Sequence, residues 1–411
     1  MKTNNNIPQG YKNSPLGIIP QEWEVKKLGD ITEINPSKEE VSSQFVTFLA
    51  MSDVSEHGGV IKENIVHKSS IKPGLTSFKR GDIIIAKITP CFENGKGALL
   101  NNITSEYGFG STEFHVIRYR QCNKFIYYHT MSYAFRKRLE SQMTGSAGQK
   151  RVPADSISSY KIPVPSLPEQ QKIAEILSTW DKAIEKQTQL IKKLELRKKG
   201  LMQQLLTGKK RVLGFSGEWK KVIFSSIIDR MSNGYVYDTN NTGDIPITRI
   251  ETISKGYIDY SKVGFIQYVG ELEKYKLRKG DILFSHINSI AHIGKVAMFD
   301  GNNDLYHGMN LLLIRAKETM NKNYLYYFLS STIARRKVRS FAKQAVNQAS
   351  VNTDELKKWI LCIPEIEEQN VIAQILAETD QEIKLAREKL ELLRQQKHGL
   401  MQQLLTGKKR I

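Results

Sequence analysis

Cysteine is scarce in this chain, and its spacing excludes two common kinds of stabilising site. The 411 residues include only three cysteines, Cys91, Cys122 and Cys362, which are too far apart in sequence to form a metal-type pair. The eight histidines show no ligand spacing either. We therefore expect no structural disulfide and no metal site.

Long apolar runs are also lacking. The chain has no stretch of about 18 consecutive apolar residues, the length that a membrane-spanning helix requires. The segment from Met1 to Pro8 contains no apolar stretch of the kind found in signal peptides, and neither end carries a lipidation motif. These absences predict a cytoplasmic protein with no membrane partner.

The sequence contains none of the motifs that competing enzymatic functions need. It has no Asn-Pro-Pro-aromatic motif for methylation of a base amino group, no glycine-rich methyl-donor fingerprint, no Walker A motif and no His-Glu-x-x-His. Segment 145–150 only resembles a phosphate loop, because Arg151 stands where a serine or threonine would bind magnesium. Asp82 and Lys87 could suggest a nuclease, but a structural aspartate in a Gly-Asp turn is the better interpretation. We expect no catalysis by the chain itself.

Acidic residues are too few to balance the basic ones. The 61 lysines and arginines, against 42 aspartates and glutamates, give a formal net charge of +19. A charge of this size attracts polyanions from a distance, and nucleic acid is the leading candidate. A basic protein with no nucleic-acid partner is the alternative on charge alone.

What the chain does contain is a long internal repeat. Twelve residues, Gly-Leu-Met-Gln-Gln-Leu-Leu-Thr-Gly-Lys-Lys-Arg, occur at 200–211 and recur without change at 399–410. The same offset of 199 residues extends the match upstream, from Glu169 to Glu368 and from Asp181 to Asp380. Self-similarity at a fixed period sets the whole architecture, so the protein is two copies of one unit.

The two copies share scaffold positions and differ between them. Gly81-Asp82-Ile83 matches Gly280-Asp281-Ile282 at the same offset. Segment 87–94, by contrast, does not resemble its counterpart 286–293. Two similar frames therefore carry different loops.

Each copy ends in a long segment with helical periodicity. Apolar residues follow a heptad for roughly five heptads from about residue 168 to 206, which predicts a rod of about 57 Å paired with another helix. Gly208 and Gly407 are the expected stops. The alternative is a helix packed only on its own domain. The residues expected to pair the helices are Ile173, Trp180, Leu194, Leu201, Ile372, Leu393 and Leu400.

The segments before the helices are typical of mixed α/β domains. Strands are predicted at 81–86, 114–118, 280–284 and 311–315. One amphipathic helix is predicted in each copy, at 124–139 and 323–338. Trp23, Trp219 and the tyrosine pairs 127–128 and 326–327 are expected to anchor cores rather than to stack on bases.

Basic and polar residues gather in the divergent loops and around the amphipathic helices. Cationic side chains neutralise phosphates, while Asn, Gln, Ser and Arg can read base edges. DNA contact and a merely solvated connection are both open for these loops. The candidate DNA contacts are Lys87, Thr89, Asn94, Lys96, Arg136, Ser146, Gln149, Lys150 and Arg151 in the first copy, and His286, Asn288, Lys295, Arg335, Lys343, Asn347 and Gln348 in the second.

The duplicated motif Pro-x-x-x-Glu-Gln-x-x-Ile-Ala-x-Ile-Leu, followed by a helix ending Gly-Leu-Met-Gln-Gln-Leu-Leu-Thr-Gly, resembles the specificity subunit of type I restriction-modification systems. The resemblance covers nearly the whole chain. It implies two α/β target-recognition domains, 1–165 and 212–363, separated by two conserved helices, 166–211 and 364–411, that form an antiparallel coiled coil. It also implies that each domain reads half of a split, asymmetric site in double-stranded DNA.

The resemblance implies partners as well. Two methyltransferase subunits would dock around the helices and domains, and restriction/translocase subunits would join through them. S-adenosylmethionine would then bind to the methyltransferase partner, while the specificity chain holds no cofactor. Adenine methylation and DNA cleavage, for defence against foreign DNA, would be activities of the complex and not of this chain.

Two functions from other classes stay open. A free-standing architectural DNA-binding protein would need no methyltransferase partner. A self-sufficient modifying enzyme would need a catalytic motif, which the sequence does not contain.

Overall fold

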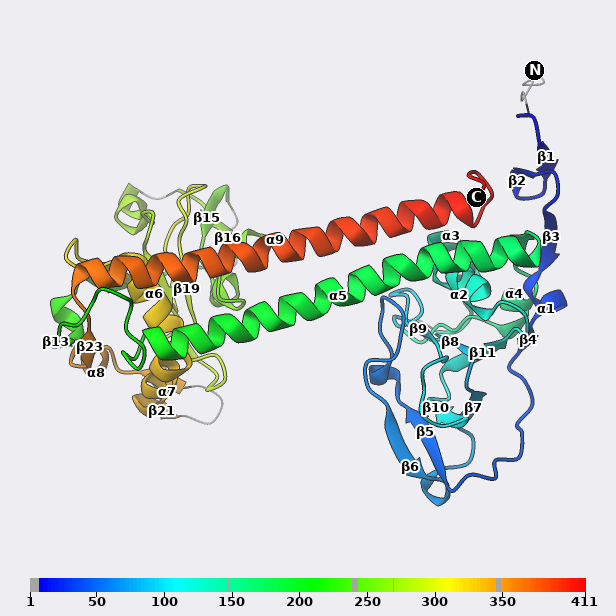
Figure 1. The fold of residues 1–411 in the computed structure, drawn as a ribbon. Helices are drawn as coiled ribbons and strands as arrows, with labels where there is room; N and C mark the ends of the chain where they lie inside the picture. The colour runs from blue at the N-terminus through cyan, green and yellow to red at the C-terminus, as the bar shows by residue number, and fades with distance from the viewer. Residues whose placement is uncertain (1–6, 147, 239–242, 269, 345–348) are drawn as a thin grey trace. The chain divides into compact units, whose positions relative to one another are not determined.

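In a computed structural model, the protein is described over residues 7–146, 148–238, 243–268, 270–344 and 349–411 (Figure 1). The chain forms two compact units. The first unit groups Met1–Thr188 with Lys389–Ile411, and the second unit is Gln189–Glu388. Each unit therefore contains one α/β domain, the first part of the helix that follows it, and the last part of the other copy's helix.

The two long helices lie within the predicted segments 166–211 and 364–411. Helix α5 spans Leu167–Leu205 and α9 spans Ile366–Leu404. Gly208 and Gly407 follow the helix ends with φ of 69° and 71°, in the left-handed region that glycine adopts at low cost. The predicted stops are confirmed.

Within each unit, ion pairs join one long helix to the other helix or to the segment just after it. The pairs are Glu169–Arg410 and Asp181–Lys397 in the first unit, and Asp380–Lys198 and Glu368–Arg211 in the second. In both units a residue later in one helix meets a residue earlier in the other, so the helices run antiparallel there. Each pair also has its counterpart at the offset of 199 residues.

The domain of the first unit contains two four-stranded sheets. One has the order β6-β5-β10-β7 and the other β4-β11-β8-β9. Neighbouring strands are antiparallel except β5 and β10, which are parallel. The strands are β4 (Glu33–Ile34), β5 (Phe45–Leu49), β6 (Asn64–His67), β7 (Thr76–Lys79), β8 (Ile83–Ala86), β9 (Gly97–Leu99), β10 (Tyr107–Gly110) and β11 (Phe114–Arg118).

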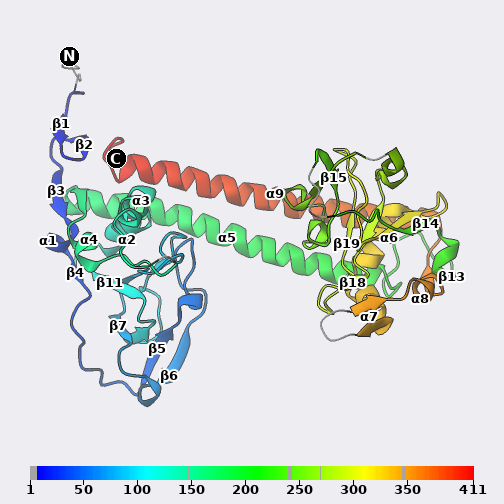
Figure 2. The same cartoon turned by 180° about the vertical axis from the view of Figure 1, so that it is seen from behind.

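Smaller elements complete the first unit. Two-stranded sheets are formed by β1 (Tyr11–Ser14) with β2 (Gly17–Pro20), and by β3 (Glu24–Lys27) with β12 (Lys161–Val164). The helices of the domain are α1 (Leu28–Ile31), α2 (Asn123–Met131), α3 (Tyr133–Glu140) and α4 (Ala154–Ser158), with 3-10 turns at η1 (Met51–Asp53) and η2 (Lys68–Ser70). Figures 1 and 2 both show α2 and α3 beside the start of α5.

The second unit repeats this plan. Its largest sheet has the order β14-β20-β17-β19, beside the smaller sheets β13-β23, β15-β16 and β18-β22-β21. The strands are β13 (Lys220–Ile223), β14 (Ile228–Asn233), β15 (Ile245–Ile247), β16 (Gly264–Ile266), β17 (Ile282–Phe284), β18 (Ile287–Asn288), β19 (Val296–Met298), β20 (Leu312–Ala316), β21 (Ala342–Gln344), β22 (Ala349–Val351) and β23 (Ile360–Ile363). The helices are α6 (Lys322–Ser330), α7 (Thr332–Ser340) and α8 (Thr353–Lys357), with 3-10 turns η3 (Phe224–Ser226), η4 (Ile250–Ile253), η5 (Tyr260–Lys262) and η6 (Gly270–Tyr275).

The mixed α/β prediction is confirmed, but the prediction of one amphipathic helix in each domain is wrong. Two short helices replace it, α2 with α3 and α6 with α7. The break falls at Ser132 and at its counterpart Ser331, which adopt extended backbone and accept a hydrogen bond from the N–H of Phe135 or Ala334. A serine that caps the second helix in this way gives the backbone an alternative to continued helix.

The central strand of each domain is buried on both faces. Ile83 and Ile85 of β8 pack in a core with the helices, while Ile84 packs in a second core beneath the other sheet. The alternation of side chains along a strand accounts for this division, which β17 repeats with Leu283 facing away from Phe284. Strand β8 therefore connects two cores, and the loop that follows it starts from a fixed position.

The helix ends pack on the domain of the other copy. In the first unit, Leu404 and Leu405 of the second copy join Ile173 in one core with Trp23. In the second unit, Leu205 and Leu206 of the first copy join Ile372 in a core with Phe224. The alternative of helices packed only on their own domains is therefore wrong, since each domain core needs a helix end from both copies.

Candidate nucleic-acid interface

Two loops that the sequence singles out lie side by side in the first domain. Segment 87–94 leaves the buried strand β8, and segment 144–151 precedes α4. A β-bridge joins Ile88 to Arg151, and the Thr89 N–H donates to the carbonyl of Lys150 at 2.9 Å. The Thr89 hydroxyl donates to the Gly148 carbonyl at 3.2 Å. The structure thus brings two separate candidate loops into one surface.

The second domain pairs the corresponding loops at the same positions. Strand β18 pairs with β22, and Ile287 lies opposite Ser350. These residues are the counterparts of Ile88 and Arg151 at the offset of 199. The amide of Asn288 donates to the Ser285 hydroxyl at 3.2 Å. One scaffold therefore presents a different pair of loops in each domain.

Several candidates in the first domain are available at this surface. Ser146, Gln149 and Lys150 are exposed, and Asn94 is exposed with its amide bonded to Glu56 at 3.1 Å. Lys87 and Thr89 are half-buried at the start of their loop. The exposed group on segment 146–150 combines one cation with two neutral polar side chains, a mixture suited to phosphate and base contacts.

Arg151 lies at the edge of this surface in a bidentate ion pair. Its guanidinium donates to both carboxylate oxygens of Glu113, at 2.9 Å and 3.0 Å. The Arg151 guanidinium lowers the pKa of Glu113 below its usual range, and the carboxylate in turn raises the pKa of Arg151. The pair positions the end of the loop, and its partial exposure still leaves the cation near any bound phosphate.

The second domain has one clearly exposed candidate. Lys343 lies on β21, which pairs with β22 beside the loop strand β18. Asn347 and Gln348 fall outside the described residues. The predicted contacts of this domain are therefore placed only for Asn288 and Lys343 at the loop pair.

Two predicted contacts lie in the interior instead. Arg136 is only 7% exposed, donates to the carbonyls of Thr130 and Phe92, and lies 4.7 Å above the Phe92 ring. Burial lowers the pKa of Arg136 to about 10. His286 is likewise buried, and burial lowers the pKa of its imidazole. Arg136 and His286 are withdrawn as DNA contacts, because neither side chain reaches the surface.

Three further basic candidates support the scaffold. Lys96 donates to the Met51 carbonyl at 3.0 Å, and its counterpart Lys295 donates to the Ser254 carbonyl at 2.6 Å. Arg335, the counterpart of Arg136, donates to the Ala291 carbonyl at 3.3 Å and so braces the loop after β17. These cations are occupied by protein carbonyls, which makes them poor candidates for binding phosphate.

The residues predicted to pair the helices lie on the packed sides of α5 and α9. Ile173, Leu194 and Ile372 are buried. Leu201 packs against the core of the second unit and Leu400 against that of the first. Trp180 and Leu393 are half-buried.

Sequence reasoning missed a repeated polar contact between each domain and the helices. The Tyr128 hydroxyl donates to Asp181 at 2.6 Å, and Lys397 binds the same carboxylate. Burial, followed by the charge of Asp181, raises the pKa of Tyr128. Tyr327, Asp380 and Lys198 repeat the arrangement in the second unit. The offset of 199 shared by all three residue types is the signal that could have revealed it.

The predicted structural aspartates and core anchors are confirmed. Asp82 is 2% exposed, receives the Lys79 N–H, and is bound by two nitrogens of Arg118 at 2.8 Å. Arg315 binds Asp281 in the same way. Trp23, Tyr127, Tyr128 and Tyr327 lie in the cores, and Trp219 and Tyr326 pack against the core of the second unit.

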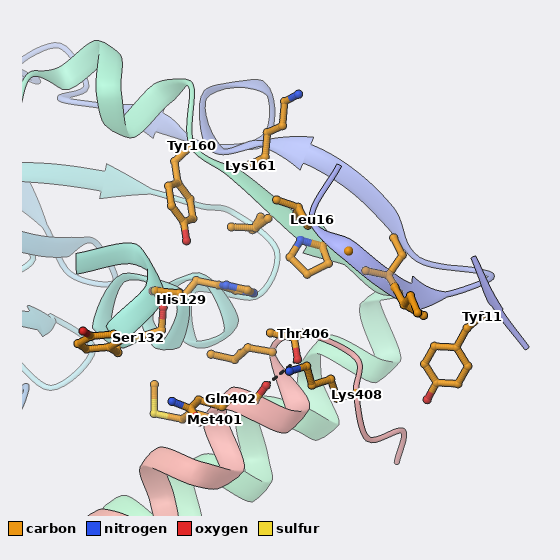
Figure 3. A pocket seen from close by; sticks show the side chains of 18 of the residues that line it. Tyr11, Leu16, His129, Ser132, Tyr160, Lys161, Met401, Gln402, Thr406 and Lys408 are labelled. Carbon is orange, nitrogen blue, oxygen red and sulfur yellow. Dashed lines mark hydrogen bonds between the residues drawn. The ribbon is translucent and has the colours of Figure 1, made fainter. Parts of the chain in front are cut away.

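A cavity in the first unit lies apart from the loop surface. It has a volume of about 880 Å³ and shares no lining residue with the candidate DNA contacts. Figure 3 shows Leu16 of the β1–β2 segment, His129 and Tyr160 of the domain, and Met401 and Thr406 near the end of α9 around it. The Nε2 atom of His129 is buried with no hydrogen-bond partner among the described residues, and burial lowers the pKa of His129 to about 3.

Among the described residues, no helix is both long and apolar enough to cross a membrane. Within the same ranges, no cluster of three or more His, Cys, Asp or Glu side chains is arranged to hold a metal ion.

Known proteins with similar sequences are specificity subunits. The chain is 41% identical over 194 residues to a putative type I restriction enzyme MjaX specificity subunit from Methanocaldococcus jannaschii, an alignment spanning 46% of each chain. It is 43% identical over 161 residues to the type I restriction enzyme EcoAI specificity subunit from Escherichia coli, spanning 38% of this chain but 27% of that protein. An alignment with the MjaVIII specificity subunit of M. jannaschii is 25% identical and spans 96% of this chain and 94% of that one.

Two solved structures share the fold. A chain from a structure described as the basis of complex assembly and conformational transition of the type I R-M system gives a TM-score of 0.61 at 17% identity, covering 95% of this chain and 99% of its own. The type-I restriction-modification system S subunit from M. genitalium gives a TM-score of 0.55 at 12% identity, covering 98% of each chain. The family model for the type I restriction modification DNA specificity domain matches residues 20–196 and 217–395, one match for each repeat. The protein therefore belongs to the type I restriction-modification DNA specificity family.

Proposed function

We propose that the chain is a non-catalytic subunit that binds a DNA site in two parts and directs a methyltransferase to it. Each domain reads one half of the site, and because the two loop pairs carry different side chains, the halves differ in sequence. The two long helices act as an antiparallel coiled coil that holds the domains apart.

One observation carries this proposal. The same backbone pairing, Ile88 with Arg151 and Ile287 with Ser350, presents unrelated loop sequences on two equivalent domains. A fixed frame with exchangeable loops is what recognition of two different DNA sequences requires, since base edges must be met by different side chains. The formal charge of +19 supports binding to the phosphate backbone.

The partners follow from the family. We propose that two type I methyltransferase subunits bind the chain and supply S-adenosylmethionine and the methylation chemistry, and that restriction/translocase subunits join the same assembly in the cytoplasm. Cleavage and methylation are then activities of the complex.

Reconstitution tests this function. The purified chain alone should neither methylate nor cleave DNA, whereas addition of its methyltransferase subunit should give adenine methylation at one bipartite sequence. Turnover by the chain alone would contradict the proposal. Sequence-specific DNA binding without any complex with the methyltransferase would favour the alternative, a free-standing architectural DNA-binding protein.

A matched pair of lysine variants tests the loop surface. Lys150→Ala removes an exposed cation from the loop pair, and Lys161→Ala removes one from β12, away from it. Lys150→Ala should weaken DNA binding and reduce the slope of log affinity against log salt by about 0.9, the value for one phosphate contact. Lys161→Ala should leave the slope unchanged. Equal slopes in the two variants would show that this loop does not contact the DNA backbone.

A further inference from the structure

Ion pairs between the long helices fall into two classes. Asp181–Lys397 and Asp380–Lys198 are related by the offset of 199, so each repeat contributes the same aspartate and the same lysine. If a repeat were paired with a second copy of itself, the same contact would form. These duplicated pairs therefore hold the helices together without selecting which repeat pairs with which.

Two ion pairs of the second class lie in the second unit. Arg197 forms an ion pair with Glu382, and Arg387 binds Glu195 at 2.5 Å. All four side chains are about half exposed. At the offset of 199, the corresponding positions in the first unit are Gln396 opposite Ala183 and Arg394 opposite Thr188, which form no ion pair. Arg394 binds Glu391 of its own helix instead.

Pairing between identical repeats would remove these contacts. Two first repeats would place Arg197 opposite Ala183 and Glu195 opposite Thr188, with no charge complement at either position. Two second repeats would place Glu382 opposite Gln396 and, with like charges, Arg387 opposite Arg394. When the first repeat pairs with the second, Arg197 meets Glu382 and Arg387 meets Glu195. Both arginines then have a carboxylate partner.

We propose that Arg197–Glu382 and Glu195–Arg387 form a charge code that makes the first repeat pair with the second rather than with another copy of itself. The code discriminates both by attraction in the correct arrangement and by the Arg387–Arg394 contact in the wrong one. Its consequence is an assembly that always carries one of each domain. The inference concerns pairing alone and holds whether or not the proposed DNA function is correct.

Nicking the intact, folded chain gives a direct test. Leu213 is 98% exposed in the connection after α5, so a protease site placed there can be cut after folding. Isotope-labelled and unlabelled nicked proteins are mixed so that their halves can exchange. Native mass spectrometry then counts the assemblies that contain one of each repeat and those that contain two identical repeats. Exposed ion pairs contribute about 0.2–1 kcal/mol each and every mixed assembly contains two of them, so the ratio of mixed to identical-repeat assemblies should exceed its statistical value by about two- to thirty-fold.

One charge reversal should invert the preference. Arg387→Glu places two glutamates together in the correct pairing and creates an attraction to Arg394 in the pairing of two second repeats, so the mixed assembly should fall by about ten-fold. Adding Glu195→Arg should restore it. Lys384→Glu is the matched control, because Lys384 is exposed and pairs only with Glu388 of its own helix. Equal effects of Arg387→Glu and Lys384→Glu, or a statistical distribution in the unmodified sequence, would overturn the proposal.

A second measurement uses the uncut chain. A double-mutant cycle on thermal unfolding of Glu195→Gln and Arg387→Gln should show favourable coupling that falls sharply at about 1 M salt, where the Debye length shortens to about 3 Å. A coupling of zero at low salt would mean that the contact does not act in the folded protein, and would overturn the code even if the nicked halves failed to exchange.

Discussion

The two domains share scaffold contacts, among them a polar contact that joins each domain to the helices, and differ in the loops after β8 and β17. Asp181 bridges Tyr128 and Lys397 in the first unit as Asp380 bridges its counterparts in the second. The loops after β8 and β17, 87–94 and 286–293, share only the isoleucine at positions 88 and 287. Contacts preserved in both copies are therefore those of the scaffold, and a residue that recurs at the offset of 199 is a poor candidate for reading a base.

The two domains also differ in the interior, at positions 129 and 160 of the first domain and the equivalent positions 328 and 359 of the second. His129 and Tyr160 line a cavity in the first unit, whereas their counterparts Phe328 and Trp359 pack with ring centroids 5.5 Å apart. Phe224 adds a third ring to the same cluster. The first domain thus has a cavity and a buried imidazole Nε2 with no hydrogen-bond partner among the described residues, where the second has a cluster of tilted aromatic rings.

Exchanging one domain should have the largest effect on DNA recognition. Residues 213–361 are replaced by the domain of another family member that keeps tryptophan and tyrosine at positions 219 and 327, so that the contacts to Glu368 and Asp380 are retained. We expect one half of the methylated site to change and the other half to stay. Sequencing of methylated sites in the host measures this. A change in both halves would show that the domains do not read DNA separately.

A buried carboxylate should give the next largest effect. Glu368 is fully buried, binds Arg211 through two nitrogens and receives the Trp219 indole N–H at 3.2 Å. Glu368→Gln removes the charge that compensates Arg211 and should lower the free energy of unfolding of the second unit by about 3 kcal/mol. Urea unfolding followed by Trp219 fluorescence measures the change.

Two matched variants calibrate that result. Glu169→Gln makes the same change in the first unit, where the carboxylate is partly exposed, and should cost less. Glu367→Gln alters an exposed neighbour and should cost about nothing. If Glu368→Gln and Glu367→Gln unfolded alike, the ion pair with Arg211 would not stabilise the unit.

The sequence predicted most of the fold because the fold depends on periodic patterns. Heptads and the glycine stop gave α5 to within a residue, the repeat placed α9 between Pro364 and Gly407, and the run 114–118 matches β11. The division of the amphipathic helix was missed because a serine cap overrides helical periodicity only through its backbone geometry. The packing of each helix end on the domain of the other copy could not be predicted from the sequence. The two helix ends are identical in sequence, so the sequence does not show which domain each one contacts.

The site was predicted less well, for a related reason. Composition alone placed Arg136 and Lys96 among the DNA contacts, although both are bound to protein carbonyls. Their recurrence as Arg335 and Lys295 already indicated a scaffold role. Ser146 and Lys150, which are exposed and have alanines as counterparts, remain as predictions, whereas Gln149 recurs as Gln348 and is the weaker candidate.

An aromatic side chain in place of the cavity-lining His129 should stabilise the first unit. His129→Phe introduces the residue that the second domain has at the equivalent position, Phe328. It also removes a buried nitrogen that has no hydrogen-bond partner among the described residues, which should stabilise the unit by about 1 kcal/mol at pH 8. Because the folded pKa of about 3 lies below the ordinary 6.5, the folded state binds fewer protons, and stability falls as pH drops below 6.5. The gain from the substitution should therefore grow by about 2 kcal/mol at pH 5.

Unfolding measured at both pH values checks this prediction. Phe328→His is the reciprocal variant and should make the second unit sensitive to acid. A gain from His129→Phe that is the same at pH 8 and pH 5 would show that His129 is protonated in the folded protein.

The smallest effect concerns a fragment that ends at Arg211, which should pair through its own helix as a symmetric dimer. The duplicated contacts allow this, because Asp181 of one chain would meet Lys198 of the other, as Asp380 does in the intact protein. Two features weaken the dimer: Arg197 would face Ala183 instead of Glu382, and Trp180 would stand where the intact chain has Thr379. Since Trp180 is only half-buried, overpacking should cost about 1 kcal/mol, and Trp180→Thr should recover it.

Sedimentation of the fragment measures this balance, and its DNA target gives an independent reading. With methyltransferase, the dimer should methylate an interrupted palindrome built from the first half-site, with half-sites about one helical turn of DNA apart or a multiple of it. A fragment that stays monomeric at every concentration, or methylates sites without two-fold symmetry, would show that the repeats are not interchangeable. A dimer strengthened by Ala183→Glu, which gives Arg197 a partner, would show instead that charge, and not shape, limits pairing of identical repeats.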